Sequence, residues 1–308
     1  MLESGSGIRV AQFSSSLRSQ IAMLIWYDLT GALLSRRRPV FPRNYIEDLF
    51  AWQSSTEWTF LALNGYPDEL IMVLHDLATA VEALTTPTDE AGARQAEVAR
   101  ELERRLWVAE LHSVDADVTI LFECWRMGLL LYCARALKTA AANPFTQQQQ
   151  QRSQSASMSP RMRLLDRSLS SSPAFTTASD NTLMVESNNA TSNRCKCYAE
   201  DIFYLTMRLS PTSALQKQCL IPMLLAGCEM TSSPDDLQHR KTVETYCDRW
   251  NSLSQLAVFS SAKHVLRIVW ALKDGGFDFE KVWWVDVLNK TWAMQDSQGS
   301  LTKEWLFG

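Results

Sequence analysis

The chain has 308 residues, of which 46% are hydrophobic, and its formal net charge is −4. This hydrophobic content can form a large core and excludes a chain that is disordered throughout, while the mild negative charge gives no electrostatic footprint for binding nucleic acid. Because the seven cysteines follow an N-terminus without an apolar signal segment, we expect reduced thiols in a cytosolic or nuclear setting.

Apolar residues recur at helical spacing along the chain, without a convincing set of alternating strands bounded by hairpin turns. One such stripe contains Val243, Tyr246, Cys247, Trp250, Leu253 and Ala257. The sequence therefore predicts an all-α bundle of about ten antiparallel-packed helices. We expect helices near residues 10–35, 43–52, 56–63, 67–84, 89–111, 115–141, 197–209, 212–229, 234–255, 258–273 and 279–291.

The apolar run VTILFECWRMGLLLYCARAL, residues 118–137, has the length of a membrane span. Glu123 and Arg126 lie near its centre, where each charge costs about 2.5–3.5 kcal/mol in a bilayer. Further charged residues bracket the run closely. We therefore expect a central buried helix and no membrane partner.

Between Asn143 and Asn193 the composition changes to glutamine and serine, with the run Gln147–Gln151 and few aromatic residues. Such a stretch cannot bury enough apolar surface to offset its chain entropy, so we expect a disordered insertion over 143–193. Neither flanking half has a complete set of apolar stripes. We therefore predict one domain over residues 1–308, interrupted by this insertion, with two domains as the alternative.

The stretch around Ser233-Pro234-Asp235-Asp236 raises the question of a reactive site. Its order is that of a helix start, with Ser233 as N-cap, proline at the first position and acids in the first turn. Gly227 suits the end of the preceding helix or a close approach to a neighbour. A magnesium site at the paired aspartates would need a second polar motif, which we do not find, and Cys228 with His239 has no third orienting group. We expect a corner between helices.

Other candidate ligands also have structural interpretations. Cys195-Lys196-Cys197 lacks the second pair that a zinc site usually needs. The remaining cysteines lie on apolar helix faces: Cys124, Cys133, Cys219, Cys228 and Cys247. His112, Asp115 and Asp117 suit the end of one helix and the acidic start of the next. Arg36-Arg37-Arg38-Pro39 is best interpreted as a solvated helix end, with a nuclear import signal as the alternative.

The sequence has no glycine-rich phosphate loop, no Gly-x-Ser-x-Gly elbow and no His-Glu-x-x-His motif. It therefore predicts no catalytic, cofactor-binding or metal-ligating residues. Four of its eleven tryptophans lie in apolar helix contexts and are assigned mainly to the core: Trp26, Trp125, Trp250 and Trp270. An aromatic pocket between helices that holds a small apolar ligand stays open as a hypothesis.

A series of short motifs follows in order along the chain: Trp26-Tyr27-Asp28, Arg38-Pro39-Val40-Phe41, Gly65-Tyr66-Pro67-Asp68-Glu69-Leu70, Leu131–Leu137, Pro211, Pro222–Glu229, Arg240, Trp270–Asp274 and Val282–Leu288. This series resembles the C-terminal regulatory region of fungal binuclear zinc-cluster transcription factors, and in particular the second of the two large families of such regions. The resemblance runs from about Trp26 to Leu288, without the insertion. Tyr66 stands where the family often has cysteine, a difference that touches only packing.

The resemblance implies a non-enzymatic, all-helical regulatory domain in the nucleus whose partners are the transcription machinery or co-regulator proteins. The class binds DNA through six cysteines in two paired clusters, and this chain has none of that pattern, so DNA contact would need that separate module. A homodimer and an effector pocket are left open. The alternatives are a helical metal-dependent enzyme of isoprenoid-type metabolism and a degenerate scaffold without a ligand.

Overall fold

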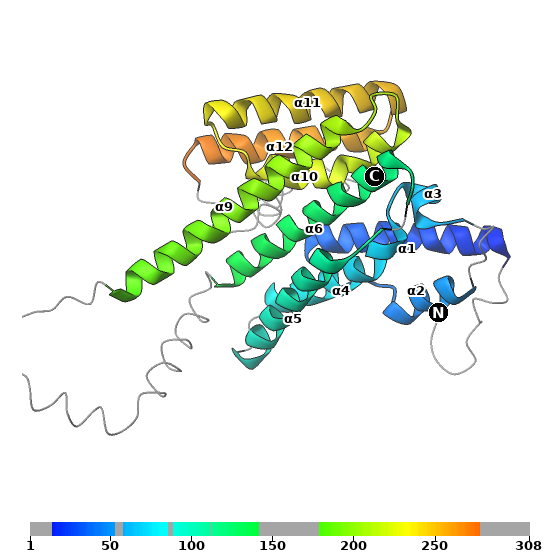
Figure 1. The fold of residues 1–308 in the computed structure, drawn as a ribbon, viewed down its shortest axis with the longest axis horizontal. Coiled ribbons are helices and arrows are strands. Elements are labelled where there is room, and N and C mark those ends of the chain that lie inside the picture. The colour runs from blue at the N-terminus through cyan, green and yellow to red at the C-terminus, as the bar shows by residue number, and fades with distance from the viewer. Residues whose placement is uncertain (1–13, 53–57, 86–88, 112, 142–178, 278–308) are drawn as a thin grey trace, which may run out of the picture.

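The computed structural model describes residues 14–52, 58–85, 89–111, 113–141 and 179–277 (Figure 1). Across these ranges the chain forms ten α-helices and one 3₁₀-helix, and no strand. The predicted all-α fold class is therefore confirmed. Within the same ranges, no helix is both long enough and apolar enough to cross a lipid bilayer.

The first six helices agree closely with the predicted segments. Ser14 caps the first helix by accepting a hydrogen bond from the Leu17 amide, and the helix ends at Arg36, which adopts a left-handed conformation with φ 53°. Thr59 caps the third helix, which therefore begins later than predicted. The bounds are α1 Ser15–Ser35, α2 Arg43–Trp52, α3 Phe60–Asn64, α4 Asp68–Thr85, α5 Asp89–Val108 and α6 Ala116–Ala141.

Two helical segments after residue 178 differ from the prediction. Residues 179–192 contain no proline or glycine that would stop a helix, and the helix there begins well before the predicted position 197. The predicted segment 212–229 divides in two because Pro222 is accommodated only in a first helical turn. The bounds are α9 Ser179–Arg208, η2 Ala214–Cys219, α10 Leu220–Glu229, α11 Pro234–Ser254 and α12 Ala257–Asp274.

The α9 helix thus takes in the last part of the predicted insertion. Residues 142–178, which hold the rest of that insertion, lie outside the described residues, and so does the predicted helix 279–291.

Helix α6 lies at the centre of the molecule, as its apolar sequence predicts. It contacts α4 and α5 on one side and α9, η2 and α10 on the other, and it runs alongside α9 (Figure 1). Glu123 and Arg126 form an ion pair within the helix. Arg126 also donates to the Trp107 and Ala109 carbonyls at the end of α5. The hydroxyl of Tyr132 donates a 2.6 Å hydrogen bond to the Leu33 carbonyl and so ties α6 to α1.

A cluster of buried apolar side chains continues from α1 through to α12. Helices from both sides of residues 142–178 contribute to it, since α6 packs on α9 and α10. The α11 and α12 helices lie side by side against α10 (Figure 1). These contacts support the proposal that the chain forms one domain.

Cleavage between residues 142 and 178 should therefore leave the two helical halves associated. Limited trypsin treatment can cut this stretch at Arg152, Arg161, Arg163 and Arg167, which lie in its polar, serine-rich sequence. We expect both fragments to elute together from a native size-exclusion column, because each half buries the apolar face of the other. Separate elution of two folded fragments would instead indicate two independent domains.

Candidate functional site

A cavity of about 390 Å³ opens between α1, α3, α6, η2, α10 and the start of α12. Its walls are mostly apolar and aromatic. The lining residues are Met23, Trp26, Tyr27, Leu34, Leu63, Asn64, Trp125, Lys217, Gln218, Leu220, Ile221, Leu224, Leu256, Ala257, Val258 and Phe259. This size and lining are typical of small-molecule sites in proteins.

Two lining residues of this cavity, Trp26 and Trp125, belong to an aromatic cluster with Tyr66, which itself does not line the cavity. The ring centroids of Trp26 and Trp125 lie 5.5 Å apart in an edge-to-face arrangement, and Tyr66 lies 4.8 Å from Trp26 and 4.7 Å from Trp125. Such tilted and edge-to-face pairs are favoured by the ring quadrupoles. The cavity thus brings together two of the four tryptophans that the sequence assigned to the core, while the indole of Trp270 donates a hydrogen bond to the Gly227 carbonyl elsewhere.

Gly65 places α3 directly against η2 at the cavity wall. It ends α3 with φ 68°, a conformation that glycine adopts at little cost. A Cβ atom there would lie 2.1 Å from Cγ of Gln218, so a larger residue would push Gln218 away. The glycine that opens one of the quoted motifs therefore sets how Asn64 and Gln218 meet at the cavity.

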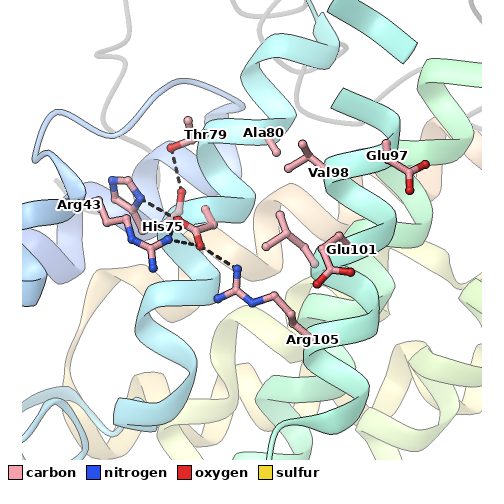
Figure 2. Close-up of a pocket in the computed structure, with 10 residues that line it drawn as sticks. Arg43, His75, Thr79, Ala80, Glu97, Val98, Glu101 and Arg105 are labelled. Atoms are coloured by element: carbon pink, nitrogen blue, oxygen red, sulfur yellow. Dashed lines mark hydrogen bonds and ion pairs between the residues drawn. The ribbon is translucent and has the colours of Figure 1, made fainter. Parts of the chain in front are cut away.

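A second cavity, of about 660 Å³, lies between α4 and α5 near the start of α2 (Figure 2). Asp76 forms its charged wall, where it accepts hydrogen bonds from Arg43 and from Arg105, the latter at 3.0 Å, and lies 3.5 Å from Nδ1 of His75. Burial raises the pKa of Asp76, but these hydrogen bonds outweigh burial and hold it at about 2. The Nε2 atom of His75 lies 3.2 Å from the Phe41 carbonyl.

The charges of this second cavity are compensated by one another. Two arginines share the Asp76 carboxylate, and the acids on the opposite wall, Glu97 and Glu101, pair with Arg100 and Arg104 on α5 itself. Sequence reasoning missed this cluster, because no periodicity links Arg43 to a carboxylate 33 positions later. The first cavity is therefore the stronger candidate for a ligand site.

The paired aspartates form a helix start, as predicted. Ser233 accepts a hydrogen bond from the Asp236 amide, and Asp236 accepts two from Thr231. Lys196 of α9 lies 3.3 Å from the same carboxylate, whereas the Asp235 side chain is exposed. Burial opposes ionisation of Asp236, but its hydrogen bonds prevail and lower its pKa to about 2. This carboxylate is engaged in joining α9 to α11.

The remaining candidate ligands do not converge either. The Cys228 thiol is buried, which raises its pKa, while His239 stacks on Phe203 with ring centroids 4.7 Å apart. Cys195 is buried and Cys197 is exposed, so the two thiols face different environments. Within the described parts of the chain, no three His, Cys, Asp or Glu side chains gather as a metal site would require.

The acidic start of α6 and the basic end of α1 are helix ends, as the sequence predicts. Asp115 accepts hydrogen bonds from the amides of Asp117 and Val118 and so caps α6, whereas His112 lies outside the described residues. In the basic run, Arg36 ends α1, and Arg37 forms a 3.1 Å ion pair with Asp28.

Several of the quoted motif residues meet at the C-terminal end of α10, which we name the α10-end cluster. Arg135 of α6 pairs with Glu229 at 3.2 Å, and Lys273 donates to the Cys228 carbonyl. Arg240 reaches both oxygens of Asp274 at 2.7 and 2.8 Å and lies over the Trp270 ring. The cluster, defined as Arg135, Gly227, Cys228, Glu229, Arg240, Trp270, Lys273 and Asp274, therefore joins α6, α10, α11 and α12.

Gly227 allows this junction to close. A Cβ atom at Gly227 would lie 2.7 Å from Cδ2 of the fully buried Leu266 on α12. Because α10 continues to Glu229, the close approach to a neighbour explains this glycine, and the helix end does not.

Comparison with known proteins gave one finding. A family model described as "Fungal specific transcription factor domain" matches residues 3–295. Searches of curated proteins and of solved structures each gave no significant match. The matched range includes the whole motif series from Trp26 to Leu288, as well as both cavities and the α10-end cluster.

Proposed function

Since the chain belongs to the fungal-specific transcription factor domain family, we propose that its role in transcription regulation is non-enzymatic and is exerted in the nucleus. In this proposal the helical surface contacts the transcription machinery or co-regulator proteins. A small effector that enters the cavity between α1, α6 and α12 changes the output of those contacts.

The cavity of about 390 Å³ carries the effector part of this proposal. It lies where helices from both halves of the chain meet, because α1, α3 and α6 supply one side and η2, α10 and α12 supply the other. A ligand bound there would contact both halves at once. Its binding energy would favour the arrangement of helices that fits it best.

Two further observations support a role without catalysis. Burial raises the pKa of the Cys133 and Cys247 thiols to about 12, which does not suit a nucleophile at neutral pH. The acids whose pKa values shift most are also engaged within the fold. Ion pairs and hydrogen bonds hold Asp76 and Asp236. Burial raises the pKa of Asp68 to about 6, and its carboxylate accepts a hydrogen bond from the Phe60 amide at 2.7 Å.

A reporter assay tests this proposal. The complete chain is fused to an unrelated sequence-specific DNA-binding domain, and reporter output is compared with that of the DNA-binding domain alone. We expect the fusion to change output severalfold. Replacing Ala257, an exposed residue at the cavity, by tryptophan should fill the site and shift that output.

The matched control is Leu253→Trp, which adds the same ring at an exposed position outside the cavity. We expect this variant to behave as the wild type. A fusion without effect on the reporter would contradict the regulatory role, and equal output from the two tryptophan variants would contradict the effector cavity alone.

A further inference from the structure

We propose that the cavity selects an amphipathic anion, a ligand with an aromatic or aliphatic body and a single carboxylate or sulfonate group. This inference rests on the proposed effector role and adds the chemical class of the ligand. Its basis is the uneven polarity of the lining, which combines apolar walls with hydrogen-bond donors and one cation.

The charge of the lining is one-sided. Lys217, in the last turn of η2, is its single ionisable cation, and none of the lining residues is an aspartate or glutamate. The Lys217 side chain is only partly exposed and has no carboxylate partner among the described residues. Lys196 and Lys263, by contrast, are paired with Asp236 and Asp248. An anionic ligand would supply the missing partner.

A neutral polar group of the lining, the Asn64 amide, points to the same chemistry. The indole Nε1 of Trp125 is buried without an acceptor among the described residues, but it is closed off from the cavity and would not contact a ligand there. The Nδ2 atom of Asn64 has only the sulfur of Met23, at 3.9 Å, and a thioether is a weak acceptor. Buried donors are normally paired, so a ligand that brings acceptor oxygens is favoured over one that brings donors.

The body of the ligand follows from the walls. Trp26, Leu224 and Phe259 present aromatic and branched apolar surface, and the volume of about 390 Å³ suits a molecule of two or three fused or linked rings, or an acyl chain of similar bulk. Burial of that body supplies affinity, and the ion pair with Lys217 supplies selectivity.

Two fluorescent probes that differ in one group test this inference on the complete chain. 1-Anilinonaphthalene-8-sulfonate carries the anion, and N-phenyl-1-naphthylamine has the same rings without it. We expect the wild type to bind the sulfonate probe with a 1:1 stoichiometry and about tenfold more tightly than the neutral probe. One charge-assisted hydrogen bond changes a dissociation constant by about that factor.

The variant Lys217→Met keeps an apolar stem of similar length and removes the charge. It should lose the preference for the sulfonate while binding the neutral probe as before, whereas Lys241→Met, an exposed lysine on α11 outside the cavity, should keep it. Ala257→Trp should abolish binding of both probes and so locate them. Melting curves followed by circular dichroism should show that all variants fold.

The outcomes separate this inference from the proposed function. If both probes bind the wild type equally, or if Lys217→Met keeps the preference for the sulfonate, the anion selectivity is overturned and the effector cavity stands. If neither probe binds, or if Ala257→Trp leaves both bound, the cavity is not a ligand site. This inference and the effector part of the proposed function then both fail, and the regulatory role is decided by the reporter fusion.

Discussion

Replacing Arg135 by methionine should lower the free energy of unfolding by about 3–5 kcal/mol, the range for breaking a buried ion pair. The side chains of Arg135 and Glu229 are only 8% and 12% exposed, so the variant leaves the Glu229 carboxylate buried and removes Arg135, its ion-pair partner. Lys273 cannot fully replace it, because burial lowers the pKa of Lys273 and its ammonium already donates to the Cys228 carbonyl. Urea unfolding at neutral pH, followed by circular dichroism, measures the loss.

A double-mutant cycle identifies the cause. The variant Glu229→Gln removes the other charge, and in combination with Arg135→Met it should recover part of the loss, so the two effects are strongly non-additive. The control is Arg100→Met, which breaks a pair whose side chains are 58% and 74% exposed and should cost less than about 1 kcal/mol. Additive effects of the two buried substitutions would contradict the pairing of Arg135 with Glu229.

Local chemistry accounts for what the sequence predicted well. The start of α11 is specified by four consecutive residues, since Ser233 supplies the cap and Pro234 the first helical position. The buried course of α6 follows from an apolar run whose two central charges pair within one turn. Signals of this kind lie within a few residues of each other, so no knowledge of the tertiary structure is needed to interpret them.

For the candidate site, the sequence predicted only that aromatic residues were available to form a pocket, and not where that pocket lies. The sequence has enough tryptophan to suggest an aromatic pocket, but the pocket depends on Trp26 and Trp125 meeting 5.5 Å apart across 99 positions of chain. Its polar side depends on Gly65, which lets Gln218 approach α3. Both conditions are set by the packing of whole helices, which periodicity along one helix does not reveal.

The series of motifs along the chain has a physical explanation in the structure. In the structure Glu229, Arg240 and Lys273 lie at the end of α10. Glu229 pairs with Arg135 of α6. Arg240 donates to the Met230 carbonyl just after α10, and Lys273 donates to the Cys228 carbonyl. Each of these three motif residues therefore has a specific polar partner at the junction.

Asp28 is the centre of a second junction of this kind. The junction joins two of the motifs, Trp26-Tyr27-Asp28 and Arg38-Pro39-Val40-Phe41. The Asp28 carboxylate is 8% exposed and accepts hydrogen bonds from the amides of Val40 at 2.6 Å and Phe41 at 3.0 Å. Arg37 adds an ion pair at 3.1 Å. These bonds fold the segment after α1 back onto the helix and place the Phe41 carbonyl beside His75 of α4.

Replacing Asp28 by alanine should therefore cost about 3 kcal/mol of unfolding free energy, because two backbone amides lose a charged acceptor in a partly buried setting. Asp28→Asn keeps an acceptor oxygen and should cost about 1 kcal/mol, while Arg37→Met, at a side chain that is 46% exposed, should cost still less. Hydrogen exchange gives a local measurement, since the amides of Val40 and Phe41 should exchange faster in Asp28→Ala but not in Arg37→Met. If Asp28→Ala and Arg37→Met destabilise the protein equally and leave both amides protected, the segment is held by the ion pair and the carboxylate does not act through the backbone.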